Sequence, residues 1–230
     1  MCIFLNHSPK KHAKIFDKQL FLLYTYYVKN ISRSNTVDIR DMTEKKLSGE
    51  KIYDGKIIRV ERDEVRLPDG ATAPREVVRH PGAVCVVPLT DKNEVILVRQ
   101  YRYPEARVFT EIPAGKLEAG EHSAEHFADA ARRELREETG AVCSRLTFIG
   151  DFYSSPAILD EVIHMYLAEG LAVGEASPDD DEFLDILCVP LDELCYMIAR
   201  GDIADGKTQA AVLKVKYILE KRNEKNEAEC

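Results

Sequence analysis

Two short apolar runs lie close together near the middle of the chain: residues 83–89 (AVCVVPL) and 95–98 (VILV). Only the turn sequence TDKNE separates them, and runs of this length suit strands that are buried on both faces. An amphipathic pattern follows over residues 123–139, with Phe127, Ala131 and Leu135 on one face and Gly140 as its stop. The two patterns predict paired buried strands followed by a helix.

The flanking sequence extends this pattern. Residues 55–80 alternate apolar and polar side chains around PDG, where Pro68 and Gly70 favour the turn of a hairpin. Strands are predicted again within 145–155, 161–171 and 183–191, and two closing helices within 191–200 and 207–221. This order indicates an α/β (α+β) sandwich with a mixed β-sheet.

Composition limits the function classes. The chain has 230 residues and a formal net charge of −8, which argues against a general nucleic-acid or membrane binder because such proteins need a basic face. The six cysteines are scattered, without a C-x-x-C pair that would indicate a zinc site or a disulfide framework. We therefore expect reduced thiols and a cytoplasmic location.

The first 41 residues differ from the rest because they are basic. Their apolar stretch, LFLLYTYYV at 20–28, is shorter than the roughly 20 residues that a membrane-spanning helix needs. We expect four regions: a basic extension outside the core (1–41), an N-terminal β-hairpin region (42–80), the main domain (81–222) and a polar tail (223–230).

Three carboxylates crowd the end of the predicted helix. Glu134, Glu137 and Glu138 project from neighbouring positions on one side, where like charges cost about 0.2–0.5 kcal/mol per pair. One interpretation is an exposed helix laced by ion pairs to nearby arginines: Arg132, Arg133 and Arg136. The other is a site for a hard divalent cation such as Mg²⁺, which takes carboxylate and phosphate oxygens.

The stretch RELREETG with Ala141 resembles the second half of the Nudix box, G-x5-E-x7-R-E-U-x-E-E-x-G-U, and GKLEAGE at 115–121 resembles its first half. Eleven residues separate Glu121 from Arg133 where the box has seven, and the extra four amount to about one helical turn. Glu125 has the seven-residue spacing, but its matching glycine position is Ala119. Either glutamate could therefore fill the first glutamate position of the box.

Further segments, VRQYRYP, EIPAGKLE, FYSSPAILDEVIHMYLAEGL and GDIADGKTQAAVLK, resemble the ADP-ribose pyrophosphatase branch of this family. The resemblance implies a Nudix-type α/β/α sandwich, usually a homodimer in which the N-terminal strand region is exchanged. It also implies hydrolysis of ADP-ribose to AMP and ribose 5-phosphate, with Mg²⁺ or Mn²⁺ as cofactor.

The resemblance also implies roles for individual residues of the site. It implies that Glu134 and Glu138 are the principal metal ligands, with Glu137 a further carboxylate at the site and the Ala114 carbonyl completing it. It implies that Arg133 orients the glutamates. The general base is expected in the acidic loop PDDDEFLD, where Glu182 is the first candidate and Asp180 the second; the alternative is a solvated acidic turn.

Residues that would contact the substrate are expected near the end of the second buried strand. Arg99, Gln100 and Arg102 are implied to face the phosphates or the terminal ribose, and Arg79 is a weaker candidate. The alternative for the arginines is a surface ion pair with Glu105 or Glu111.

Two other functions stay open. A sister enzyme would cleave another nucleoside diphosphate sugar, such as ADP-glucose or GDP-mannose. A non-catalytic module would bind a nucleotide without cleaving it. We expect a nucleotide sugar as the small-molecule partner, no nucleic acid, no membrane and a homodimer.

Overall fold

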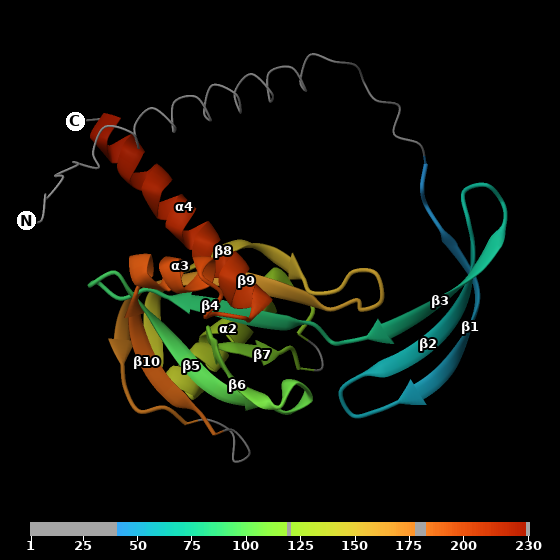
Figure 1. The fold of residues 1–230 in the computed structure, drawn as a ribbon, viewed down its shortest axis with the longest axis horizontal. Coiled ribbons are helices and arrows are strands. Elements are labelled where there is room, and N and C mark those ends of the chain that lie inside the picture. Colours follow the sequence, from blue (N-terminus) through green and yellow to red (C-terminus); the bar gives the residue numbers. More distant parts are fainter. Residues whose placement is uncertain (1–40, 119–120, 178–182, 229–230) are drawn as a thin grey trace, which may run out of the picture. The chain divides into compact units, whose positions relative to one another are not determined.

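The computed structural model describes residues 41–118, 121–177 and 183–228 (Figure 1). The predicted extension, apart from Asp41, lies outside the described residues, as do both candidates for the general base, Asp180 and Glu182. No helix among the described residues is long and apolar enough to cross a membrane.

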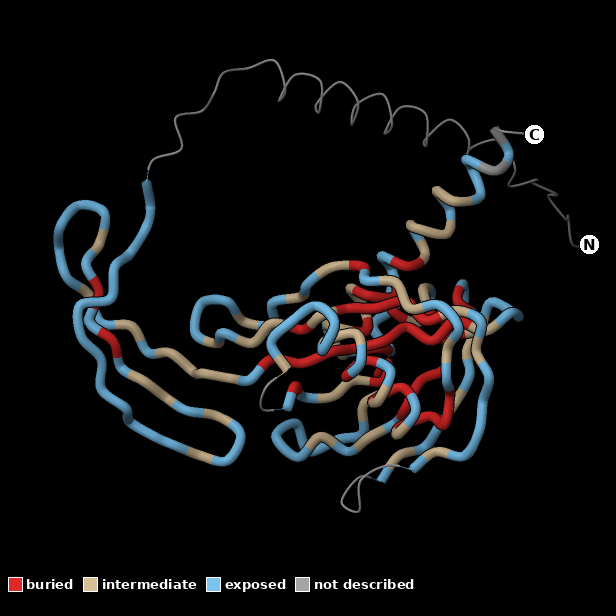
Figure 2. The backbone as a smooth tube through the Cα atoms, turned by 180° about the vertical axis from the view of Figure 1, so that it is seen from behind, coloured by how far each residue is buried: buried red, intermediate tan, exposed pale blue. Residues whose placement is uncertain are grey.

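An antiparallel sheet of three strands begins the described chain: β1 (Lys45–Asp54), β2 (Arg59–Arg66) and β3 (Thr72–Arg79). The predicted hairpin is β2 and β3, and Gly70 in their turn has φ 90°, a conformation that glycine adopts without strain. Every residue of β1 is exposed, as the pale blue tube in Figure 2 shows. β1 therefore buries little of its own apolar surface.

The two apolar runs form strands of two different sheets. β4 (Ala83–Pro88) is buried throughout and belongs to a four-stranded sheet of order β7-β4-β9-β8, in which only the β4–β9 pair is parallel. β5 (Glu94–Arg102) instead joins a sheet of order β10-β5-β6. The remaining bounds are β6 (Arg107–Glu111), β7 (Ala114–Lys116), β8 (Ala141–Tyr153), β9 (Val162–Val173) and β10 (Asp185–Pro190), with a 3-10 turn η1 (Tyr103–Glu105) between β5 and β6.

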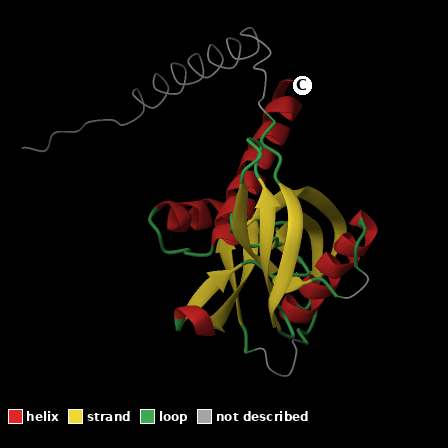
Figure 3. Cartoon of the chain, turned by 90° about the vertical axis from the view of Figure 1, so that its right-hand side faces the viewer, coloured by secondary structure: helices red, strands yellow, loops and turns green. Residues whose placement is uncertain are grey.

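Helices cover the strands on two sides (Figure 3). Val84 and Val86 of β4 pack with Leu135 of α2 (Ala124–Thr139), whereas Cys85 and Val87 belong to a second cluster. That second cluster contains residues of α3 (Leu191–Ala199) and α4 (Gly206–Ala228). Because successive side chains of a strand point to opposite faces, β4 contributes to both cores. The predicted α/β sandwich is confirmed, with its strands divided between sheets.

Candidate active site

Helix α2 carries the three glutamates and has well-defined ends. The Ser123 hydroxyl accepts a hydrogen bond from the His126 N–H at its start, and Gly140, with φ 69°, ends it in the left-handed conformation. Between these ends, Glu134 and Glu138 are buried, at 9% and 3% exposure, next to the core residue Leu135. The acidic face is therefore not an ordinary solvated helix surface.

The guanidinium of Arg133 lies close to the carboxylates of four glutamates. Its Nη1 lies 2.7 Å from Glu134 Oε1 and 3.3 Å from Glu137 Oε2. Glu118 and Glu121 lie farther away, each 3.8 Å from the guanidinium. Burial lowers the pKa of Arg133, but these carboxylates together hold the pKa above its ordinary value. The arginine therefore offsets much of the repulsion within the acidic group.

Strand β7 approaches the same carboxylates from the neighbouring sheet. The Ala114 N–H donates to Glu138 Oε2 at 3.2 Å. A Cβ atom at Gly115 would lie 2.0 Å from the carboxyl carbon of Glu134, so the missing side chain leaves the space that this carboxylate occupies. Backbone and carboxylates are in contact here because β7 pairs with β4, which lies beneath α2.

The donor types here fit a hard divalent cation, which prefers carboxylate and carbonyl oxygens. One buried nitrogen, Arg133 Nη2, has no hydrogen-bond partner among the described residues, and its N–H can donate to an acceptor but cannot ligate a metal ion. In the conformation described, no three His, Cys, Asp or Glu side chains of the described residues converge as a ready-made metal site. Glu134 and Glu137 are engaged by Arg133 instead.

These residues line a pocket of about 1210 Å³. Its wall combines acidic and basic side chains: Glu118, Glu134, Glu137, Glu161 and Asp205, with Lys56, Arg102, Lys116, Arg133 and Lys207. A pocket of this size and charge pattern can hold a small polar molecule that carries both anionic groups and bound cations.

The predicted substrate residues of β5 separate into two groups. Gln100 and Arg102 line the pocket, but Arg99 does not. Arg99 is half-exposed and lies 4.0 Å from Asp185 of β10. Arg99 and Arg102 are three residues apart in one strand, so they point to opposite faces. Of the two arginines, therefore, only Arg102 lies at this pocket, and the role of Arg99 in substrate binding stays a prediction.

Arg79, the weaker candidate, also lies outside the pocket lining. Its guanidinium binds Glu61 and Asp160, each at 3.1 Å, and lies 3.5 Å from Asp63. The hydrogen bond to Asp160, assisted by Glu61, raises the pKa of Arg79. Three carboxylates thus hold this arginine where the sequence suggested a substrate contact.

The two candidates for the first glutamate of the box differ in surroundings. Glu121 Oε2 accepts the Glu118 N–H at 2.6 Å and lies 3.8 Å from Arg133 Nη2. Glu125 is exposed in the first turn of α2. Of the two, Glu121 is the one that the structure brings to the acidic group.

The alternative considered for Arg102, an ion pair with Glu111, forms in this structure, but Glu111 is buried and its second partner, Lys207, was not anticipated. Arg102 forms a bidentate pair with Glu111, from Nε to Oε1 at 2.8 Å and from Nη2 to Oε2 at 2.7 Å, and Lys207 contacts the same carboxylate. Burial raises the pKa of Glu111, but Arg102 and Lys207 bring it below its ordinary value. The segments EIPAG and DGKT contain Glu111 and Lys207, but no local pattern indicates that they meet.

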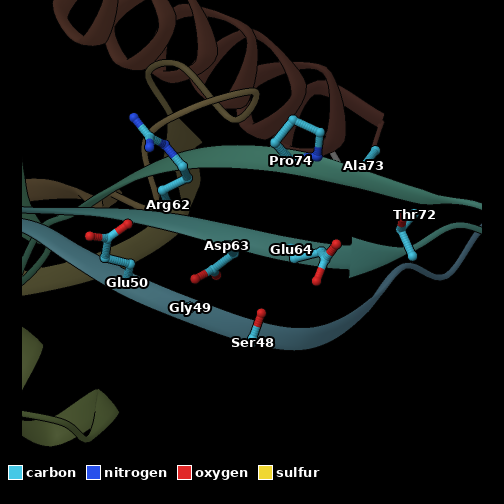
Figure 4. A pocket seen from close by; sticks show the side chains of 9 residues that line it. All are labelled: Ser48, Gly49, Glu50, Arg62, Asp63, Glu64, Thr72, Ala73 and Pro74. Atoms are coloured by element: carbon cyan, nitrogen blue, oxygen red, sulfur yellow. The ribbon is translucent and has the colours of Figure 1, made fainter.

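A second pocket, of about 360 Å³, lies on the β1–β3 sheet (Figure 4). Its lining includes Asp63, which pairs with Lys46 at 2.6 Å, and Gly49, where a Cβ atom would lie 2.4 Å from Asp63 Oδ1. The glutamates of α2 are not part of it. We therefore take the larger pocket as the candidate active site.

Comparison with known proteins gives consistent matches. The NUDIX domain profile matches residues 79–211, and a nucleoside diphosphate sugar hydrolase N-terminal domain profile matches residues 44–78. The chain is 44% identical to a methanol dehydrogenase activator of Bacillus methanolicus, over 74% of this chain and 90% of that protein. It is 40% identical to an ADP-ribose pyrophosphatase of Bacillus subtilis, over 79% and 98%. A crystal structure of an ADP compounds hydrolase is similar in fold, with a TM-score of 0.68, 22% identity, and coverage of 78% of this chain and 96% of the other.

Proposed function

Since the chain belongs to the Nudix hydrolase family, we propose that it hydrolyses the diphosphate bond of ADP-ribose to AMP and ribose 5-phosphate with the help of Mg²⁺. One observation carries the proposal: Glu134 and Glu137 of α2, both in contact with Arg133, line a large pocket with Gln100 and Arg102, and Glu138 accepts the N–H of Ala114 at the same pocket wall. The 40% identity to an ADP-ribose pyrophosphatase supports the choice of substrate.

The carboxylates of Glu134, Glu137 and Glu138 and the carbonyl of Ala114 would hold the metal. A divalent cation held there would neutralise the diphosphate charge and polarise the phosphorus. Arg133 keeps the glutamates in place through its contacts with Glu134 and Glu137. Arg102 offers its guanidinium to a phosphate oxygen of the substrate.

Hydrolysis forms a bond from a water oxygen to phosphorus and breaks the bond from that phosphorus to the bridging oxygen. A general base must take the proton of the water. We propose Glu182 for this role, with Asp180 as the second candidate, because both belong to the acidic sequence PDDDEFLD and lie between β9 and β10 in the chain. We also assign the first glutamate of the box to Glu121, since it approaches Arg133.

The deciding experiment incubates the purified protein with ADP-ribose, ADP-glucose and GDP-mannose, with Mg²⁺ and with a chelator, and separates the products by chromatography. We expect AMP to appear fastest from ADP-ribose and only with metal. If another sugar nucleotide is cleaved faster, that compound replaces ADP-ribose as the proposed substrate, and the assignment of the active site stays the same. Binding without any cleavage would favour the non-catalytic module.

The 44% identity to the methanol dehydrogenase activator supports a second candidate function, activation of a dehydrogenase. Adding the chain to a methanol dehydrogenase and measuring the rate of alcohol oxidation tests this function. The Glu138→Gln variant in the same assay shows whether activation requires the hydrolytic site.

A further inference from the structure

Lys207 lies in the first turn of α4, 96 residues from Glu111 in sequence, yet it reaches the candidate active site. Its side chain is only 11% exposed and lines the same pocket as Arg102 and Glu134. Burying an ammonium group costs free energy unless carboxylates surround it. The position is therefore one that the fold must stabilise specifically.

Glu111 provides that stabilisation for two cations at once. The carboxylate is 3% exposed and is not part of the pocket lining, whereas its partners Arg102 and Lys207 both line the pocket. Arg102 occupies both carboxylate oxygens through Nε and Nη2, and Lys207 contacts Oε2. One buried acid thus holds two basic side chains at the pocket wall.

The turn that carries Lys207 is anchored independently. Asp205 Oδ2 accepts the Thr208 N–H at 2.9 Å, and the Thr208 hydroxyl accepts the Ile112 N–H at 3.0 Å. Thr208 is fully buried, and Ile112 directly follows Glu111. These bonds tie the start of α4 to the segment that leads to Ala114, so the position of Lys207 relative to the glutamates is set by the fold.

Lys207 retains a donor for a ligand. An ammonium group has three N–H donors, and within the described part of the chain its acceptors are Glu111 and Asp205. The pocket also contains several acids, so an anionic ligand needs cations as well as metal to be held there. Lysine commonly serves as a point charge for phosphate oxygens.

We propose that Lys207 is a second phosphate-binding cation beside Arg102, and that Glu111 is the positioning residue that holds both cations toward the substrate. The group that these cations bind is the diphosphate of a nucleoside diphosphate sugar. This identification of the ligand rests on the proposed function.

The test is a calorimetric titration with α,β-methylene-ADP-ribose, an analogue whose methylene bridge cannot be hydrolysed. Lys207→Met should raise its Kd roughly 10- to 100-fold, the expected effect of losing a charged hydrogen bond. Lys216→Met is the matched control, because Lys216 lies on the same helix and also binds two carboxylates, Asp192 at 2.7 Å and Glu220 at 3.4 Å, but is not in the pocket lining. The control should bind the analogue like the parent protein.

The positioning role has its own measurement. Glu111→Gln should weaken binding although both cations are still present, and the double variant with Lys207→Met should lose less than the product of the two single effects, because coupled residues are not additive. Lys207→Arg, which keeps the charge, should recover part of the affinity. Independent effects of the two single substitutions would overturn the positioning role.

An unchanged Kd in Lys207→Met, or an equal loss in Lys216→Met, would overturn the phosphate contact; so would a parent protein that does not bind the analogue. Cleavage of ADP-ribose is measured separately. If the parent protein binds the analogue but releases no AMP, the proposed function fails, while the Kd comparison still decides the role of Lys207.

Discussion

The carboxylate of Glu134 occupies the space that Gly115 leaves by having no side chain: a Cβ atom at position 115 would lie 2.0 Å from the carboxyl carbon and 2.1 Å from Oε1. The contact joins β7 to α2, and Arg133 holds the same carboxylate from within the helix. A backbone strand and an arginine thus restrict one glutamate together.

Gly115→Ala should impair catalysis more than stability. The atoms nearest to the added methyl group belong to the side chain of Glu134 and not to the backbone, so the carboxylate is displaced while the backbone stays. A displacement of about 1 Å at a catalytic group can cost on the order of 10²-fold in rate, and we expect a loss of this size in kcat.

Gly174→Ala is the control for this substitution, since its Cβ atom would only reach ordinary contact, 3.5 Å from the Gly140 carbonyl oxygen. Rates of AMP release and thermal unfolding midpoints would be compared for both variants. A Gly115→Ala protein as active as the Gly174→Ala protein would contradict the close packing.

Glu138→Gln should lower turnover by about 10²-fold or more, the scale expected when an electrostatic contact of the transition state is lost. The amide oxygen can still accept the Ala114 N–H, so the fold should persist. Circular dichroism checks the fold. Mg²⁺ should raise the unfolding midpoint of the parent protein, because binding to the folded state stabilises it, and this shift should shrink in the variant. Unchanged hydrolysis would refute the metal assignment.

Glu121→Gln and Glu125→Gln form a matched pair that decides the first glutamate of the box. Glu121 lies near Arg133 and accepts the Glu118 N–H, whereas Glu125 is exposed. We expect the first substitution to reduce kcat about tenfold or more and the second to leave it unchanged, because only Glu121 approaches the acidic group. The reverse result would place the four extra residues of the box before Glu125.

Glu111→Gln should destabilise the protein in a pH-dependent manner. Arg102 and Lys207 lower the pKa of Glu111 in the folded state despite its burial, so its ionised form contributes stability above the unfolded pKa, about 4.3. That contribution disappears as the pH falls through the folded pKa.

Urea unfolding of both proteins at pH 7, 5 and 3.5 measures this effect. The difference in free energy of unfolding should be about 3 kcal/mol at pH 7, as expected for breaking a buried pair, and should decrease toward pH 3.5. A difference that stays constant over this range would show that Glu111 does not act as a charge.

Several features follow from patterns that span only a few residues. The hairpin turn at Gly70, the ends of α2 at Ser123 and Gly140, and the doubly buried strand β4 could all be predicted from the sequence. The contact of Arg133 with Glu137 also follows from helical spacing, because the two residues are four positions apart. β1 was not predicted as a strand, because its ten residues are exposed and show no apolar alternation to read.

The composition of the pocket wall depends on contacts between distant segments. Strand periodicity shows that Arg99 and Arg102 face opposite ways, but only the packed sheets decide that Arg102 is the one at the pocket. The local sequence suggested Arg79 as a substrate contact, and it does not indicate that the guanidinium binds Asp160, 81 residues later. Local sequence patterns therefore determined the helices and strands and the acidic face of α2. The ion-pair partner of each basic side chain was decided by tertiary packing. Ion pairs form between atoms that are close in space, and residues far apart in sequence leave no local pattern that indicates their pairing.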